Sequence, residues 1–265
     1  MYKKIISFAV AAVMMVACTT VPITGRRQLN LVSDAEMQQQ SYAAYRQFLS
    51  ENKLSRDAQA TAMVKRVGKR IQNAVEQYMA ANNMQNELAG FDWEFNLVDD
   101  DQINAFAMAG GKTVVYSGLL PVAQNETGLA VVMGHEIAHA IAKHGNERMS
   151  QALAQQFGGQ TLSALAGAQP GVTSNLIKSV YGVGSQLGLL KYGRQQETEA
   201  DKLGLVFMAM AGYDPQASIP FWQRMEAASG GQAPPEFLST HPSAGTRQNT
   251  LKQYMPEALK YYKAK

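Results

Sequence analysis

The 265 residues suit one globular domain, or at most two. Hydrophobic residues make up 46% of the chain and charged residues 17%, as in folded proteins, which excludes a disordered chain or a disulfide-stapled miniprotein. The formal net charge of +3 provides no basic surface that would indicate nucleic acid as a partner, and the single cysteine excludes an internal disulfide.

The N-terminal residues have the layout of a secretory signal peptide. Two lysines precede an uncharged, mostly apolar stretch that ends next to Cys18. Met15-Val16-Ala17-Cys18 resembles a bacterial lipobox, so we expect a signal peptide over 1–17 and a lipidated N-terminus and tether over 18–31. The lipid on Cys18 would hold the protein at a membrane surface. The alternative is an ordinary cleaved signal beside an incidental cysteine.

The mature chain reads mainly as helices, with a few short strands. A capping box at Ser33 and Glu36 predicts a helix to residue 50. Hydrophobic periodicity predicts further helices over 56–81, 126–144, 194–210, 216–228 and 243–255, and strands over 93–98, 103–108 and 113–116. Ala109-Gly110-Gly111-Lys112 is typical of a hairpin turn between the last two strands. The fold class is therefore α+β, mostly helical, with a small antiparallel sheet.

A long stretch with few charges separates the helices expected over 126–144 and 194–210. Lys178 is the only charged residue between Arg148 and Lys191. Glutamines and glycines interrupt its apolar runs, so it does not read as a membrane span. We expect residues 149–190 to act as a gate over the cleft.

The pattern His135-Glu136-Ile137-Ala138-His139 carries the strongest chemical signal. Residues four apart share one face of a helix, so both imidazoles can bind one metal ion. Glu136 is rotated by about 100° from His135, where it can reach a metal-bound water. The alternative is a pair of core histidines, but two histidines and a glutamate in an apolar helix are costly without partners.

A third ligand has to come from another element. An ideal helix would turn His144 about 140° away from His139, and Ala142 and Gly145 do not fit the metzincin pattern. Glu197 and Asp201 share a helical face, so Glu197 can be the third ligand, and Asp201 can accept the free ring N–H of a metal-bound histidine. Glu199 would point away into solvent or a salt bridge. The alternative for this acidic run is a solvated helix face.

With these motifs the sequence resembles the gluzincin metallopeptidases that include the CAAX-prenyl proteases and HtpX. It is most similar to their periplasmic lipoprotein branch, which is LoiP- and BepA-like. The resemblance runs from about Gln28 to the C-terminal helix and includes His241-Pro242-x-x-x-x-Arg247. It implies a zincin-like metallopeptidase domain over 32–265 with two metal-ligand helices, and no tetratricopeptide tail is expected.

The resemblance also implies roles for individual residues. One zinc ion per chain, bound by His135, His139 and Glu197, would activate a water whose proton Glu136 accepts. His241 and Arg247 would stabilise the oxyanion. Alternatively, His241 caps the zinc in a latent form. The segment Asn104, Ala105 and Phe106 is expected to be the edge strand that binds an extended substrate, or else simply to pack in the sheet.

Two functions follow from this pattern. The first is a membrane-anchored zinc metalloendopeptidase that degrades unfolded or misfolded cell-envelope proteins. The second is a non-catalytic zinc-binding lipoprotein that acts as a chaperone or assembly factor. For both, the expected location is the bacterial cell envelope, lipid-anchored and facing the periplasm, with the outer membrane favoured over the inner one. The sequence leaves the oligomeric state open.

Overall fold

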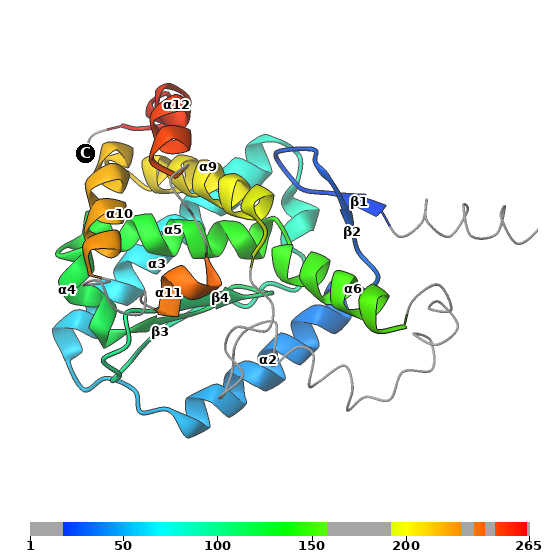
Figure 1. The fold of residues 1–265 in the computed structure, drawn as a ribbon, viewed down its shortest axis with the longest axis horizontal. Coiled ribbons are helices and arrows are strands. Elements are labelled where there is room, and N and C mark those ends of the chain that lie inside the picture. Colours follow the sequence, from blue (N-terminus) through cyan, green and yellow to red (C-terminus); the bar gives the residue numbers. More distant parts are fainter. Residues whose placement is uncertain (1–17, 158–191, 229–235, 242–246, 264–265) are drawn as a thin grey trace, which may run out of the picture.

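The computed structural model describes residues 18–157, 192–228, 236–241 and 247–263. Its α-helices are α2 (Asp34–Glu51), α3 (Ala58–Ala81), α4 (Leu120–Ala123), α5 (Glu126–Ile141), α6 (His144–Phe157), α9 (Arg194–Met210), α10 (Ser218–Ala227), α11 (Glu236–Thr240) and α12 (Arg247–Leu259). Its strands are β1 (Cys18–Thr20), β2 (Arg27–Leu29), β3 (Glu94–Val98), β4 (Ala105–Met108) and β5 (Lys112–Tyr116). Short 3₁₀ turns are η1 (Gln85–Leu88), η2 (Ser117–Leu119) and η4 (Pro215–Ala217). The expected mostly helical α+β fold is confirmed (Figure 1).

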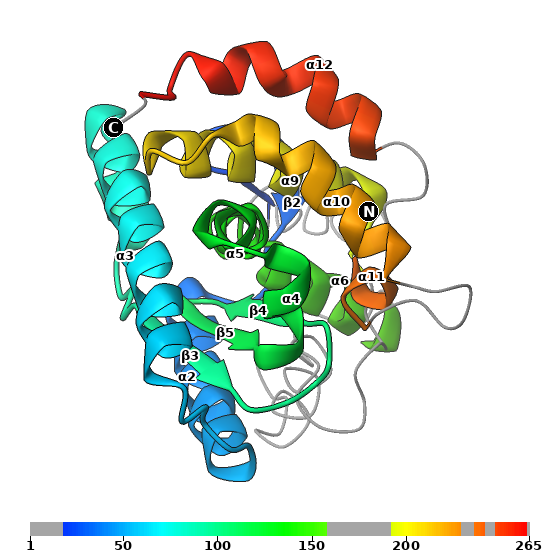
Figure 2. The ribbon, with the colours of Figure 1, turned by 90° about the vertical axis from the view of Figure 1, so that its left-hand side faces the viewer.

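Helix α5 lies at the centre of the molecule. Viewed along its axis in Figure 2, it is surrounded by α3, α9 and the sheet, while α12 covers the outer side of α9. Asn125 begins the helix, because its side chain accepts a hydrogen bond from the backbone N–H of Gly128 at 3.0 Å. Burial on every side explains why this helix is apolar around most of its circumference, apart from His135, Glu136 and His139.

The three-stranded sheet differs from the expected antiparallel one. Its strand order is β3-β5-β4, and β4 runs antiparallel to β5 as predicted. Strand β3, however, pairs parallel to β5, with Glu94 opposite Lys112 and Val98 opposite Tyr116. Alternation within one strand predicts a strand but does not specify its neighbour, so the mixed sheet could not be derived from periodicity. As a result, β4 is an edge strand on the side near α5.

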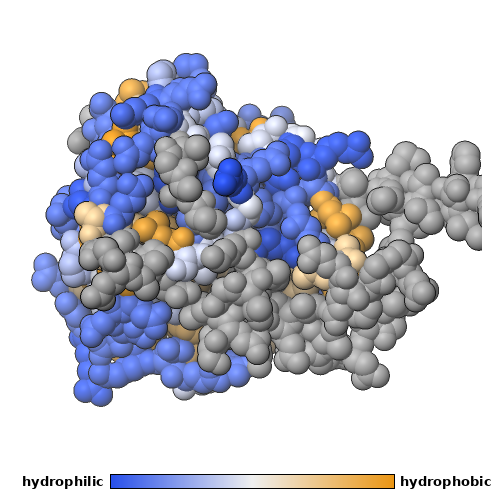
Figure 3. All heavy atoms as spheres, in the orientation of Figure 1, coloured by the Kyte–Doolittle hydropathy of each residue, from blue (hydrophilic) through white to orange (hydrophobic). Residues whose placement is uncertain are grey.

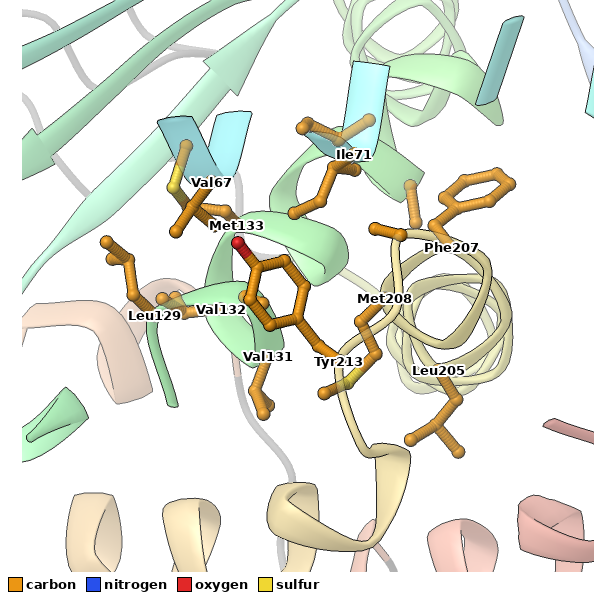
Figure 4. Packing of buried hydrophobic residues seen from close by; sticks show 14 of the residues in the cluster. Val67, Ile71, Leu129, Val131, Val132, Met133, Leu205, Phe207, Met208 and Tyr213 are labelled. Carbon is orange, nitrogen blue, oxygen red and sulfur yellow. The ribbon is translucent and has the colours of Figure 1, made fainter. Parts of the chain in front are cut away.

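The main core lies between α3, α5 and α9. Val67 and Ile71 of α3 pack towards Val132 and Met133 of α5, and Phe207 of α9 completes this layer (Figure 4). All five side chains are completely removed from solvent. A second cluster joins α2 to the sheet and to α6. Helix α5 is thereby fixed by hydrophobic burial on several sides, which is the usual basis of a rigid site.

The segment expected as a flexible tether is instead folded onto the domain. Strands β1 and β2 form an antiparallel pair, with Cys18 opposite Leu29. Val21 is 1% exposed and Gln28 4%, so the hairpin buries its own side chains against the protein. The backbone N–H of Leu31 also donates to Ser150 of α6 at 2.8 Å. The expectation of a tether was therefore wrong, because the composition of this segment gave no sign of these distant partners.

Two expectations fall outside the described residues. The signal peptide expected over 1–17 is one, and most of the gate expected over 149–190 is the other. Within the part of the chain that the structure describes, no helix is both long and apolar enough to cross a membrane. The described residues on the face shown in Figure 3 are mostly hydrophilic, with small scattered hydrophobic groups.

Candidate metal centre

Helix α5 brings the two predicted histidine ligands together. His135 and His139 lie one turn apart, and their Nε2 atoms are 3.1 Å from each other. Their exposed fractions are 2% and 1%. The expected shared helix face is therefore present, and both rings point inward.

Helix α9 adds the predicted carboxylate. Glu197 is 3% exposed, and its Oε1 lies 3.3 Å from Nε2 of His139. Its Oε2 lies 3.5 Å from Nε2 of His135. The packing of α9 on α5 thus brings residues about sixty positions apart into one cluster.

A third histidine joins the cluster from the end of α11. Nδ1 of His241 lies 3.0 Å from Oε1 of Glu197 and 3.3 Å from Nε2 of His135. The sequence left open whether His241 contacts the oxyanion or caps the metal. In the conformation seen here, its ring lies among the metal donors, which favours the capping alternative.

The four donor groups fit a tetrahedral metal ion. His135, His139, Glu197 and His241 offer ligand atoms that all lie within 4.8 Å of one another. A tetrahedral zinc site with bonds of about 2.0–2.1 Å separates its ligand atoms by about 3.3–3.4 Å. The separations given above run from 3.0 to 3.5 Å. Imidazoles and one carboxylate are also a donor set that zinc prefers.

The electrostatics of the ligands suit a cation. Burial lowers the pKa of His139 well below its ordinary value, so its imidazole is neutral. Burial opposes ionisation of Glu197, but His241 and hydrogen bonds from the other histidines lower its pKa well below the ordinary value. Burial also lowers the pKa of His135, but hydrogen bonds to Asp201 and Glu197 outweigh it and raise the pKa to about 9. A metal ion bound there would displace that proton.

Glu136 lies next to this cluster but is not one of its four donor residues. It is 1% exposed, and its Oε1 has no hydrogen-bond partner among the described residues. Nε2 of His241 lies 3.6 Å from that oxygen. Burial raises the pKa of Glu136, which brings the carboxylate closer to the range where a general base works best. The position agrees with the predicted base.

Asp201 and Arg247 lie behind the donor cluster. As expected, Oδ1 of Asp201 is 2.9 Å from Nδ1 of His135. Arg247 contacts two carboxylates: its Nε donates to Asp201 at 2.9 Å and its Nη2 donates to Glu197. Its guanidinium also lies 3.9 Å above the ring of Trp222. These contacts support Glu197 from behind, while Nη1 of Arg247 has no hydrogen-bond partner among the described residues, so the oxyanion contact stays a prediction.

His144 also differs from the expectation. Helix α5 ends at Ile141, and Lys143 has a positive φ of 58°, so His144 begins α6 in a new direction. Its Nδ1 lies 2.9 Å from Nδ1 of His139, and its Nε2 lies 2.9 Å from Oε2 of Glu199. The projection of an unbroken helix was therefore wrong. A glycine would have marked the reversal, but lysine gives no such signal.

Tyr192 is a site residue that the sequence did not predict. Its ring centroid lies 3.9 Å from that of His139 and 4.8 Å from that of His241. The guanidinium of Arg148 lies 4.0 Å from the same ring. Tyr192 follows directly after the stretch that was expected to be a gate, most of which is outside the described residues. A single tyrosine in a loop carries no spacing signal that could have identified it.

The expected substrate strand is only partly where it was predicted. Ala105 and Phe106 belong to the edge strand β4, whereas Asn104 immediately precedes it and is 4% exposed. The ring of Phe106 packs 5.1 Å from that of Phe48, which is a contact within the core. The edge position leaves the role in substrate binding a prediction.

Comparison with known proteins gives a consistent assignment. The model of peptidase family M48 matches residues 65–255. The mitochondrial metalloendopeptidase OMA1 of Schizosaccharomyces pombe is 35% identical over 243 residues, covering 90% of this chain and 66% of the relative. The human OMA1 metalloendopeptidase is 31% identical over 252 residues, covering 90% and 46%. The beta-barrel assembly-enhancing protease of Escherichia coli K12 is 35% identical over 162 residues, covering 58% and 33%.

These comparisons contradict the expected location in a bacterial cell envelope. The relatives that match over 90% of this chain, in fission yeast, cattle and humans, are mitochondrial proteins. The expectation came from the signal-peptide layout, the lipobox resemblance at Cys18 and the resemblance to a periplasmic lipoprotein branch, which are weaker indications of a location than relatives matched along 90% of the chain.

The extent of the match sets what these relatives establish. The chain spans between 38% and 66% of the length of the OMA1 relatives, so only their shared region is compared. That region contains the His135-Glu136-x-x-His139 motif, Glu197 and His241, all within the span of the family model. Since this model covers well over half of the sequence, the chain belongs to peptidase family M48, and the matched relatives are metalloendopeptidases or, in Escherichia coli, a protease by name.

Proposed function

We propose that this chain is a zinc metalloendopeptidase with one zinc ion, which hydrolyses unfolded or misfolded proteins. The observation that carries the proposal is the buried donor set of His135, His139 and Glu197 with Glu136 directly beside it. A structural zinc site would have no use for a buried glutamate whose Oε1 lacks a hydrogen-bond partner among the described residues. The names of the matched relatives support the same activity.

The residues of the chain divide the reaction between them. A bound zinc ion would act as a Lewis acid and make a water more acidic. Glu136 accepts the proton of that water and later delivers it to the leaving amine. Asp201 and Arg247 hold His135 and Glu197 in position, as hydrogen-bond partners behind metal ligands generally do. As an edge strand, β4 would bind an extended peptide through its backbone groups, a binding mode that accepts many sequences.

A specific observation keeps the second candidate function open. The ring of His241 lies between the metal donors and Glu136, where it would compete with a water. If the ring stays there, the protein is a non-catalytic zinc-binding protein that acts as a chaperone or assembly factor. If the ring can leave, the protein is a peptidase with a latent form.

The decisive variant is Glu136→Gln, which keeps the shape of the side chain and removes the base. We expect it to lower hydrolysis of a denatured protein by about 10²–10⁴-fold. Zinc stoichiometry should stay at one per chain, because Glu136 is not among the four donors. The measurement is fragment release from a denatured substrate, with zinc content determined on the same sample.

The outcomes separate the two candidates. Loss of hydrolysis with zinc retained supports the peptidase. Equal hydrolysis by a pure Glu136→Gln preparation removes the proposed mechanism. A parent chain that binds zinc, hydrolyses nothing and still prevents aggregation of the denatured substrate supports the chaperone.

The membrane attachment belongs to this proposal as well. A lipid on Cys18 would place the anchor at the first residue of β1, only eight residues before Arg26, and so bring the metal centre close to the membrane surface. Mass spectrometry of the N-terminal peptide of the membrane-extracted protein tests this. A mature chain that begins elsewhere, or carries an unmodified Cys18, contradicts it.

A further inference from the structure

The N-terminal hairpin sends one charged side chain into the protein. Arg26 lies in the turn between β1 and β2, and its side chain is 15% exposed. Its Nη1 and Nη2 donate to the two carboxylate oxygens of Glu147, each at 2.8 Å, and its Nε donates to Oε2 of Glu199 at 2.7 Å. A two-pronged arginine contact of this kind fixes both partners in one geometry.

Glu199 has three partners from two separate segments, the turn between β1 and β2 and the start of α6. Oε2 accepts from Arg26 and lies 2.9 Å from Nε2 of His144, while Oε1 accepts from the hydroxyl of Thr24. The carboxylate is paired with the guanidinium of Arg26 and also accepts from the Thr24 hydroxyl, so it faces His144 as a hydrogen-bond acceptor.

These contacts determine which ring nitrogens of His144 and His139 carry a proton. Since the arginine-paired carboxylate of Glu199 accepts, the N–H at Nε2 of His144 donates a hydrogen bond to it. Nδ1 of His144 then accepts, at 2.9 Å, from the N–H at Nδ1 of His139. With its proton on Nδ1, His139 presents the lone pair of Nε2 to Glu197 and His135, where the metal donors meet.

We infer that His144, Glu199 and Arg26 form a positioning relay that fixes the tautomer and orientation of the metal ligand His139, and that the N-terminal hairpin is part of the metal centre through Arg26. The inference rests on the metal site of the proposed function. His135 has the carboxylate of Asp201 behind it, and the relay supplies the equivalent support for the second histidine. The relay joins Arg26 to His139, which lies 113 positions further along the sequence.

The relay explains features that salt-bridge stability alone does not require. His144 is completely buried, which is costly for an imidazole unless both of its nitrogens have partners. Here each nitrogen has one, and the two partners are the proposed metal ligand His139 and the carboxylate of Glu199. A purely structural arginine anchor would need Glu147 and Glu199 but not the histidine between Glu199 and His139.

Metal affinity of the full chain tests the inference independently of proteolysis. The probes are Zn²⁺ in competition with a chelator, and Co²⁺, whose visible absorption reports the geometry of its ligands. We expect weaker zinc binding by about 100-fold in His144→Phe and about 10-fold in Arg26→Met. The cobalt spectrum of His144→Phe should change, because the ring of His139 is free to rotate.

The controls separate positioning from simple loss of structure. Arg27 is the exposed neighbour of Arg26, so Arg27→Met should leave zinc affinity and the cobalt spectrum unchanged. Arg26→Lys, which keeps the charge, should recover part of the affinity lost in Arg26→Met. If His144→Phe or Arg26→Met does not fold, Glu199→Gln replaces it. This variant removes the charge of the carboxylate that contacts both Arg26 and His144, and we expect it to bind zinc more weakly as well.

Two results would overturn the inference. One is a folded His144→Phe or Glu199→Gln whose zinc affinity and cobalt spectrum match the parent. The other is an Arg26→Met that lowers thermal stability yet binds zinc as the parent does at a temperature where both are folded. A parent that binds zinc but hydrolyses nothing would instead remove the proposed function and leave this test intact.

Discussion

The two ring nitrogens of His241 contact two different parts of the reaction centre. Nδ1 lies 3.0 Å from Oε1 of Glu197, among the metal donors. Nε2 faces Oε1 of Glu136 at 3.6 Å. The ring of Phe237 stacks on it with centroids 4.4 Å apart, and Tyr192 lies 4.8 Å away. On the proposed mechanism, this ring occupies the space that a water and a scissile carbonyl need, so turnover would require the ring to move.

Removal of this ring should therefore release activity. We expect His241→Ala to raise hydrolysis of a denatured protein by about 10–100-fold, if the open form is about 1–10% of the parent population. The measurement is kcat/KM at saturating zinc, since the variant also loses a donor and should bind zinc more weakly. Lost hydrolysis in a zinc-loaded variant would contradict the capping arrangement and support the oxyanion role.

For individual residues, the sequence predicted those pairs of site residues that lie close together on the same helix. His135 and His139 are four apart on one helix, as are Glu197 and Asp201, so helical geometry alone places each pair. It failed where the backbone reverses without a glycine, as at Lys143 before His144. It also could not assign Arg247, because the choice between oxyanion and carboxylate depends on how α12 packs on α9.

The two ligand helices cross at a pair of glycines. A Cβ on Gly204 of α9 would lie 2.9 Å from the backbone nitrogen of His135, and a Cβ on Gly134 of α5 would lie 3.0 Å from the carbonyl oxygen of Gly204. Both neighbours are backbone atoms and cannot swing aside. The missing side chains thus set the spacing between α5 and α9, and with it the distance from Glu197 to the two histidines.

Gly204→Ala should consequently disturb both stability and the metal site. Alanine favours an isolated helix over glycine by about 1 kcal/mol, but the forced separation of α5 and α9 should outweigh this and lower the free energy of unfolding by about 1–3 kcal/mol. Chemical denaturation of the metal-free protein measures the packing cost, and chelator competition measures the expected loss of zinc affinity.

Gly193→Ala, at the N-cap residue that precedes the same helix, provides the control. A Cβ at Gly193 would meet nothing closer than Oε1 of Gln196 at 3.9 Å, so zinc affinity should not change. Parent-like zinc binding by Gly204→Ala, with α5 and α9 still folded, would show that the glycine contact does not set the ligand spacing.

The elements themselves were largely predictable, and their partners were not. Helices α3 and α9 were expected over 56–81 and 194–210 and are found at Ala58–Ala81 and Arg194–Met210, because hydrophobic periodicity is a local property. The parallel pairing of β3 with β5 and the docking of the β1–β2 hairpin are non-local. The turn that bears Arg26 is stabilised by Glu147 and Glu199, more than a hundred residues away, so its own sequence reads as a tether.

Over the whole molecule, the metal centre is a point where distant segments converge. Its donors come from α5, from α9 and from the residue that follows α11, while Arg247 of α12 and Arg26 of the hairpin support them from outside. The buried carboxylates and imidazoles of this centre shift the pKa values of one another. Because the donors come together only in the folded chain, the free energy of metal binding stabilises the packing of all these elements.

Removal of zinc should therefore lower the stability of the whole domain and not only its activity. A ligand that binds only the folded state, at a free concentration of about 1,000 times Kd, stabilises it by about 4 kcal/mol. For a chain of this size that corresponds to a fall of about 8–16 °C in Tm when a chelator removes the metal. Scanning calorimetry of the parent with zinc and with excess chelator measures it. Glu136→Gln should show the same fall, because the glutamate is not a donor, whereas His139→Ala should show a much smaller one. Equal Tm values for zinc-loaded and stripped parent, at one zinc per chain, would mean that the converging segments are already rigid without the ion and that the metal serves chemistry alone.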